Sequence, residues 1–161
     1  MRDYQKYATI VAVFATVLYA ALLVAAFGLI SLATNLEVIA DRSAGPLVGP
    51  TMTAVAVLLV LIMLITLGVN PPDKQRVVVG FAIATGIAAY GLYIAAGAIL
   101  VAAGNGDPFA VLLFAGSMLA SPFALTVGLL AFIVALVYSI LLASHYGEHG
   151  RPLWPWERRG E

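Results

Sequence analysis

The chain has 161 residues, of which 63% are hydrophobic and only 10% are charged, and its mean hydropathy is +1.04. Soluble domains carry about 25% charged residues, so this composition excludes a soluble globular protein and predicts one that is solvated mainly by lipid. The net charge is zero and cysteine is absent, which argues against nucleic-acid binding, disulfides and thiolate chemistry.

Four uncharged intervals are long enough to cross a bilayer, and the first predicts a helix over 7–34. Arg2 and Lys6 precede this interval, as basic residues precede the apolar core of a signal peptide. The core of a cleavable signal is only about 7–15 residues long. Because the apolar run here is much longer, we predict a retained signal-anchor helix.

The second and third spans are predicted over 50–69 and 77–103. The proline pair at 71–72 ends the second span, because proline cannot continue a helix and also restricts the residue before it. The sequence Gly-Asn-Gly at 104–106 is a turn composition that ends the third span.

The fourth span must lie within 108–144, an uncharged interval that is too long for one crossing. At about 1.5 Å per residue, a helix of this length exceeds the hydrocarbon core, which is about 30 Å thick. A weak internal repeat indicates where the span begins. When the first span is aligned with the third, identical residues coincide at Ala15/Ala84, Thr16/Thr85, Ala20/Ala89, Leu23/Leu92, Ala26/Ala95, Gly28/Gly97, Ile30/Ile99 and Ala33/Ala102.

The repeat places Ser121-Pro122 opposite Gly49-Pro50 at the start of a returning helix. Serine is a favoured N-cap and proline suits the first helical position, so the fourth span is predicted over 122–144. The segment 107–120 is predicted as a short helix that lies in the outer interface or dips back into the bundle. The alternative is one long helix kinked at Pro122.

The basic residues predict an orientation for these four spans. Seven of the eight Lys and Arg residues lie on the N-terminus, the loop at 70–76 and the tail, which share one side of the membrane. The positive-inside rule therefore predicts a plasma-membrane protein with both termini in the cytoplasm. The excess of Arg over Lys and the abundance of Ala are typical of GC-rich bacterial genomes.

Two sets of residues within the spans are candidates for packing or binding. Tyr19, Tyr90 and Tyr93 lie near the bilayer midplane, where a hydroxyl requires a hydrogen-bond partner from another helix or from a ligand. The third span is also rich in small residues that allow close approach of helices, within the bundle or between two copies of the chain. These candidate packing residues are Gly80, Ala84, Gly86, Ala88 and Gly91.

The tail at 151–161 combines aromatic and basic residues, namely Arg151, Trp154, Trp156, Arg158 and Arg159. Tryptophan favours the headgroup region and arginine favours an anionic leaflet, so the tail is predicted as an interfacial anchor. The alternative interpretation is a docking peptide for a partner protein.

No catalytic, cofactor-binding or metal-binding residue is predicted. The motif His-Tyr-Gly-Glu-His at 145–149 matches the spacing of inverted zinc peptidases. However, a glycine inside the motif disfavours the helix that must present both histidines, and no segment remains to form a substrate cleft. The four spans contain no ionisable Asp, Glu, Lys, Arg or His of the kind that coupled transporters place in the membrane.

The layout as a whole resembles that of small, uncharacterised four-helix membrane proteins of GC-rich bacteria. We therefore expect an all-α integral membrane bundle, with one domain over 1–150 built from two tandem helical hairpins. We expect a non-catalytic accessory or scaffold component of a larger membrane assembly, without a cofactor. Its expected partners are the lipid bilayer and another membrane protein or a second copy. The alternative is a channel or facilitator for a neutral or lipid-like solute.

Overall fold

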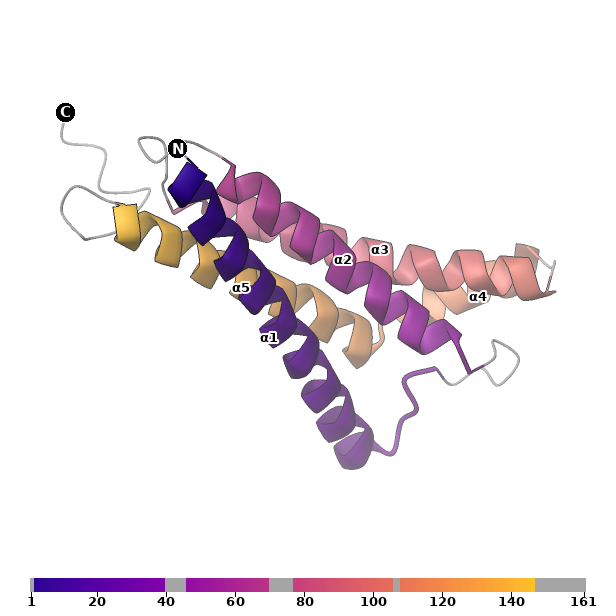
Figure 1. Cartoon of the computed structure of the whole chain (residues 1–161). Coiled ribbons are helices and arrows are strands. Elements are labelled where there is room, and N and C mark those ends of the chain that lie inside the picture. The colour runs from indigo at the N-terminus through magenta and orange to yellow at the C-terminus, as the bar shows by residue number, and fades with distance from the viewer. Residues whose placement is uncertain (1, 40–45, 70–76, 106–107, 147–161) are drawn as a thin grey trace.

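The computed structural model describes residues 2–39, 46–69, 77–105 and 108–146, and within these ranges it contains five helices and no strand (Figure 1). The all-α prediction is confirmed: four long apolar helices and one short helix form a bundle. The helices are α1 (Arg2–Thr34), α2 (Val48–Gly68), α3 (Val79–Asn105), α4 (Pro108–Leu119) and α5 (Pro122–Tyr146).

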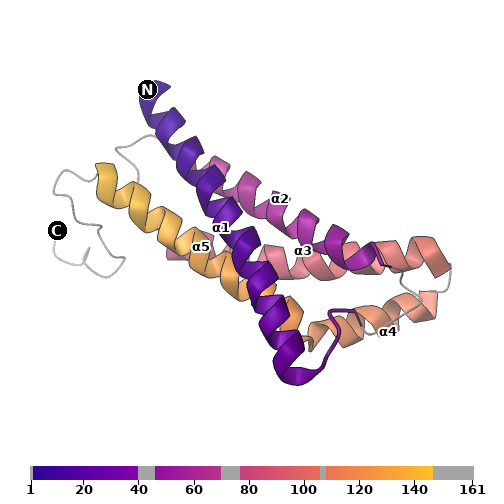
Figure 2. The same cartoon turned by 60° about the horizontal axis from the view of Figure 1, so that its bottom comes forward.

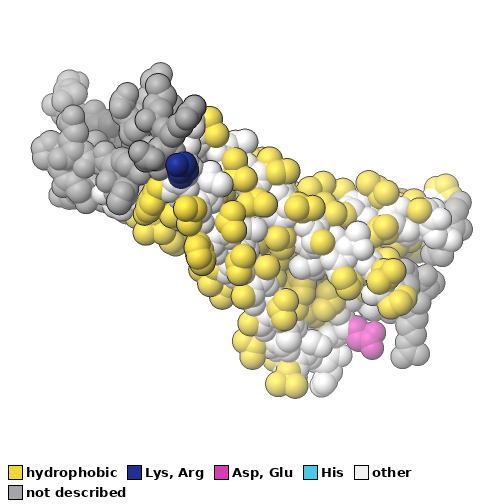
Figure 3. All heavy atoms as spheres, viewed as in Figure 1, with side chains coloured by type: hydrophobic (Ala, Val, Ile, Leu, Met, Phe, Trp, Pro, Cys, Tyr) yellow, Lys and Arg dark blue, Asp and Glu magenta, His cyan; other side chains and the backbone are white. Residues whose placement is uncertain are grey.

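The four long helices are apolar on all sides, which is typical of helices surrounded by lipid. α2, the shortest of them with 21 residues, is about 32 Å long and therefore matches the thickness of the hydrocarbon core. Large apolar side chains also point outward, such as Phe14 with 72% and Leu32 with 83% of its surface exposed. Hydrophobic side chains cover much of the face seen in Figure 3.

The bundle has two ends, a terminal end with the N-terminus and a loop end with the α1–α2 connection. At the terminal end, α1 and α3 begin and α2 and α5 end; at the loop end, α1 and α3 end and α2 begins. α3 packs extensively against α2, α4 and α5, whereas α1 packs mainly against α2 and α5. α3 therefore has the more extensive contacts with the rest of the bundle.

The buried stripe of α2 shows how these helices pack. It consists of Met52, Ala56, Val60, Leu64 and Gly68. This strict spacing of four residues follows the i±4 ridge of a helix, which fits into the grooves of its neighbours. Leucine, valine and methionine fill the volume of the core, and alanine and glycine bring the backbones closer together.

The fully buried residues of α1 end at Leu23, and beyond it only partly buried side chains such as Phe27 pack on the core. The buried residues of α1 are Ala8, Ala12, Thr16, Tyr19 and Leu23. From Val24 to Thr34 none of its side chains is buried, and α1 diverges from α2 toward the loop end (Figures 1 and 2). The helix ends where Asn35 adopts a left-handed conformation with φ of 53°, which asparagine tolerates better than most residues.

The two hairpins differ in their connections. A separate helix, α4, lies between α3 and α5, whereas the described parts of the α1–α2 connection, 35–39 and 46–47, contain no helix. α4 packs mainly on α3 and only slightly on α5. The chain turns at Ala120–Ser121, and Leu125 N–H donates to the Ser121 carbonyl at 3.2 Å as α5 begins.

Candidate functional site

The three candidate tyrosines have three different environments. Tyr19 is fully buried, and its hydroxyl donates to the Val127 carbonyl of α5 at 3.0 Å. Tyr90 is half-buried, and its hydroxyl donates to the Leu119 carbonyl at the end of α4 at 2.7 Å. Tyr93 is fully buried, and its hydroxyl has no hydrogen-bond partner among the described residues.

Tyr93 belongs to an aromatic cluster that sequence reasoning missed. The rings of Phe27 and Tyr93 are 6.3 Å apart, and the rings of Phe27 and Phe123 are 5.5 Å apart, both in edge-to-face geometry. The cluster joins α1, α3 and α5. Phe27 lies two helical turns beyond Tyr19 and therefore on a similar face of α1, which is the signal that could have identified it.

Sequence reasoning also missed a junction at the terminal end. The buried Tyr138 hydroxyl of α5 donates to the Ala8 carbonyl of α1 at 3.0 Å. A Cβ atom on Gly68 of α2 would lie 2.6 Å from this hydroxyl and 3.1 Å from the Ala8 Cβ. Only glycine fits there without displacement, so the junction ties three helices together.

The small residues of α3 separate into an inward and an outward group. Gly86 faces α5, where an added Cβ would lie 2.9 Å from the Gly128 carbonyl oxygen and 3.0 Å from the Phe132 Cβ. In contrast, a Cβ on Gly80 or Gly91 would meet no atom within 4 Å. Ala84 is exposed and Ala88 is half-buried. One candidate therefore packs inside the bundle, while Gly80, Ala84 and Gly91 form an outward small-residue face on both sides of the exposed Ile87.

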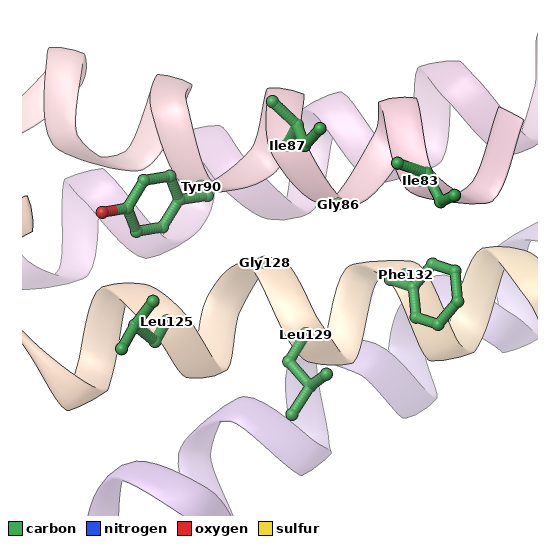
Figure 4. A pocket seen from close by; sticks show the side chains of 8 residues that line it. All are labelled: Ile83, Gly86, Ile87, Tyr90, Leu125, Gly128, Leu129 and Phe132. Carbon is green, nitrogen blue, oxygen red and sulfur yellow. The ribbon is translucent and has the colours of Figure 1, made fainter. Parts of the chain in front are cut away.

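A shallow apolar groove of about 390 Å³ lies beside the closest approach of α3 and α5. It is lined by Ile83, Gly86, Ile87, Tyr90, Leu125, Gly128, Leu129 and Phe132. Figure 4 shows that Gly86 and Gly128 lie on facing stretches of the two helices, with the larger side chains around them. Apart from the Tyr90 hydroxyl, the lining side chains are hydrocarbon, so the groove suits an aliphatic chain.

The remaining candidates fall outside this geometry. The tail residues Arg151, Trp154, Trp156, Arg158 and Arg159 lie outside the described residues. The same holds for Gly147, Glu148 and His149 of the histidine motif. Within the described ranges, no group of three His, Cys, Asp or Glu side chains could hold a metal ion.

Four long apolar helices with a buried, hydrogen-bonded interior define a small multi-pass membrane protein. The whole chain, residues 1–161, matches the model of a family of unknown function, DUF6121, and the protein belongs to this family. No curated protein and no solved structure matches the chain.

Proposed function

We propose that this protein is a non-catalytic accessory or scaffold subunit that binds a transmembrane helix of a larger assembly. The observation that carries the proposal is the outward small-residue face of Gly80, Ala84 and Gly91, where added Cβ atoms on both glycines would meet open space. Small residues let a second helix approach the backbone closely, which is the main source of helix association in lipid.

The interior of the bundle supports a scaffold more than a facilitator. A facilitator requires a path for its solute, and Tyr19 and Tyr90 were the expected lining of that path. Tyr19 is instead fully buried, and Tyr90 lines a shallow groove beside α3 and α5 rather than a passage between the helices. Helix association is therefore the function that the packing favours.

The proposal includes a bacterial plasma membrane and cytoplasmic termini. Lys6 lies at the terminal end and Glu37 lies just beyond the loop end of α1. Together with the excess of basic residues on the terminal side, this distribution favours the terminal end as the cytoplasmic one.

The test is purification of the tagged full chain from its native membrane in mild detergent, compared with Ala84→Leu and Ala25→Leu. Both alanines are exposed, but Ala25 lies on α1, away from the proposed face. We expect a stoichiometric membrane partner with the unaltered chain and with Ala25→Leu, and at least tenfold less of it with Ala84→Leu.

Equal thermal stability of the two variants would show that the loss is not caused by unfolding. A version truncated after Gly150 tests whether the tail contributes to docking. Recovery of the chain alone or only as a homo-oligomer, or equal partner recovery with both leucine variants, would contradict the proposal.

A further inference from the structure

α4 is an apolar helix of 12 residues, which is too short to cross a bilayer. It follows α3 after only two residues and runs back along it in antiparallel order. Two contacts fix this order: a Cβ on Gly97 would lie 2.7 Å from the Phe114 ring, and Tyr90 bonds to Leu119. The carboxyl end of α4 therefore lies beside the middle of α3 (Figures 1 and 2).

The composition of α4 is unsuited to the membrane surface. An interfacial helix has one apolar face and one charged or polar face. α4 contains no charged residue, and its only polar side chain, Ser117, donates its hydroxyl to the Phe114 carbonyl of the same helix at 2.8 Å. Leu112 and Leu119 point away from the core with 69% and 56% of their surface exposed. A helix that is apolar on every side requires an apolar medium around it.

Two carbonyl groups at the carboxyl end of α4 have partners of the kind that an end inside hydrocarbon requires. A helix end leaves carbonyl groups without intrahelical partners, and in lipid no water can satisfy them. Here the Tyr90 hydroxyl bonds to the Leu119 carbonyl, and Ser121 N–H bonds to the Met118 carbonyl at 3.1 Å. Partners from the protein therefore replace water at these two carbonyl groups.

We propose that α4 is a re-entrant helix that descends into the hydrocarbon along α3, and that Tyr90 is the side chain that caps its submerged end. α5 then starts below the headgroup level and completes the crossing to the terminal side. The 25 residues of α5 extend about 37 Å, which is long enough to reach the terminal side even if the helix is strongly inclined to the membrane normal. This inference does not depend on the proposed scaffold function.

Site-directed spin labelling in lipid vesicles tests the depth of α4. The chain has no cysteine, so single cysteines can be introduced without background. Leu112→Cys, Gly116→Cys and Leu119→Cys lie on one exposed face of α4. Collisions of a label with oxygen become more frequent with depth in the bilayer, and collisions with a water-soluble nickel complex become less frequent. The ratio of the two collision rates therefore reports the depth of the label. Leu36→Cys at the loop end and Ile87→Cys on the lipid-facing side of α3 serve as the shallow and deep references.

We expect depth to increase in the order 112, 116, 119, with the label at 119 closer to the Ile87 reference than to the Leu36 reference. Equal depths for all three labels, together with access to the nickel complex, would mean that α4 lies in the interface and would overturn the proposal.

The Tyr90 cap is tested by recording the label at 119 in Tyr90→Phe. We expect the mobility of this label to rise at least twofold because the end of α4 is released. Tyr19→Phe is the matched control, since it removes a similar tyrosine-to-carbonyl bond that does not touch α4. Unchanged mobility in Tyr90→Phe, or the same rise in both variants, would overturn the assignment of Tyr90 as the cap.

Discussion

At the scale of single residues, Tyr19 and Tyr93 show how much the partner of a buried hydroxyl matters in lipid. Both side chains are fully buried, yet only Tyr19 reaches a carbonyl oxygen. A hydrogen bond between membrane helices contributes about 0.6 kcal/mol on average, whereas a buried hydroxyl without a partner costs about 1–3 kcal/mol. The same chemical change at the two positions should therefore have opposite effects.

We expect Tyr19→Phe to lower the free energy of unfolding by about 1 kcal/mol and Tyr93→Phe to raise it by about 1 kcal/mol. Each substitution removes one oxygen and keeps the ring, so the Phe27 cluster stays intact. Reversible unfolding by sodium dodecyl sulfate in mixed micelles measures both values. Destabilisation of similar size in the two variants would show that the Tyr93 hydroxyl has a partner.

At the scale of the helices, glycine positions determine which faces pack. Gly86 and Gly128 bring α3 and α5 together, because an added Cβ at either position would lie within 3.0 Å of the opposing carbonyl oxygen. Backbone atoms cannot give way as the end of a flexible side chain can. Gly91 lies on the same helix as Gly86 but faces open space, which makes it a matched control.

We expect Gly86→Ala to reduce the free energy of unfolding by about 1–3 kcal/mol, because the helices must separate to accept the methyl group. Gly91→Ala should be neutral or should stabilise the helix by up to about 1 kcal/mol, because alanine has the higher helix propensity. Thermal unfolding in detergent followed by circular dichroism distinguishes the two. Equal stability of the two variants would contradict the close approach of α3 and α5 at Gly86.

At the largest scale, we expect the charges outside the spans to set the orientation of the protein in the membrane. The four spans carry apolar side chains outward, so the bundle fits the hydrocarbon equally well in either direction across the membrane. Its direction across the membrane then depends on the segments outside the spans. Seven of the eight basic residues belong to the N-terminal segment, the loop at 70–76 and the tail.

Labelling of single cysteines in intact cells tests this orientation. We expect Leu36→Cys, at the loop end, to react with a membrane-impermeant maleimide from outside. Gln5→Cys, at the terminal end, should react only after permeabilisation. The unaltered chain contains no cysteine and provides the blank. The reverse pattern of labelling would place the termini outside.

The sequence was sufficient for the elements, because lipid enforces a simple rule on each helix separately. An apolar run must be long enough to cross the bilayer, and charges or proline must mark its ends. The short helix at 108–119 was also expected, since the uncharged interval is too long for one crossing. Whether that helix lies in the interface or enters the bundle depends on its contacts with α3, which the composition of the segment alone does not specify.

The pairing of residues across the bundle depends on how the helices pack against one another. Nothing local distinguishes Gly86 from Gly91, or Tyr19 from Tyr93, because each pair shares the same residue type and a similar apolar setting. Their difference comes from helix rotation and crossing, which bring Gly128 opposite Gly86 and Val127 opposite Tyr19. Hydrophobicity and length, both legible in the sequence, were enough to specify a four-span membrane protein. The packed centre, the apolar groove and the cap on α4 depend on contacts between segments far apart in the chain.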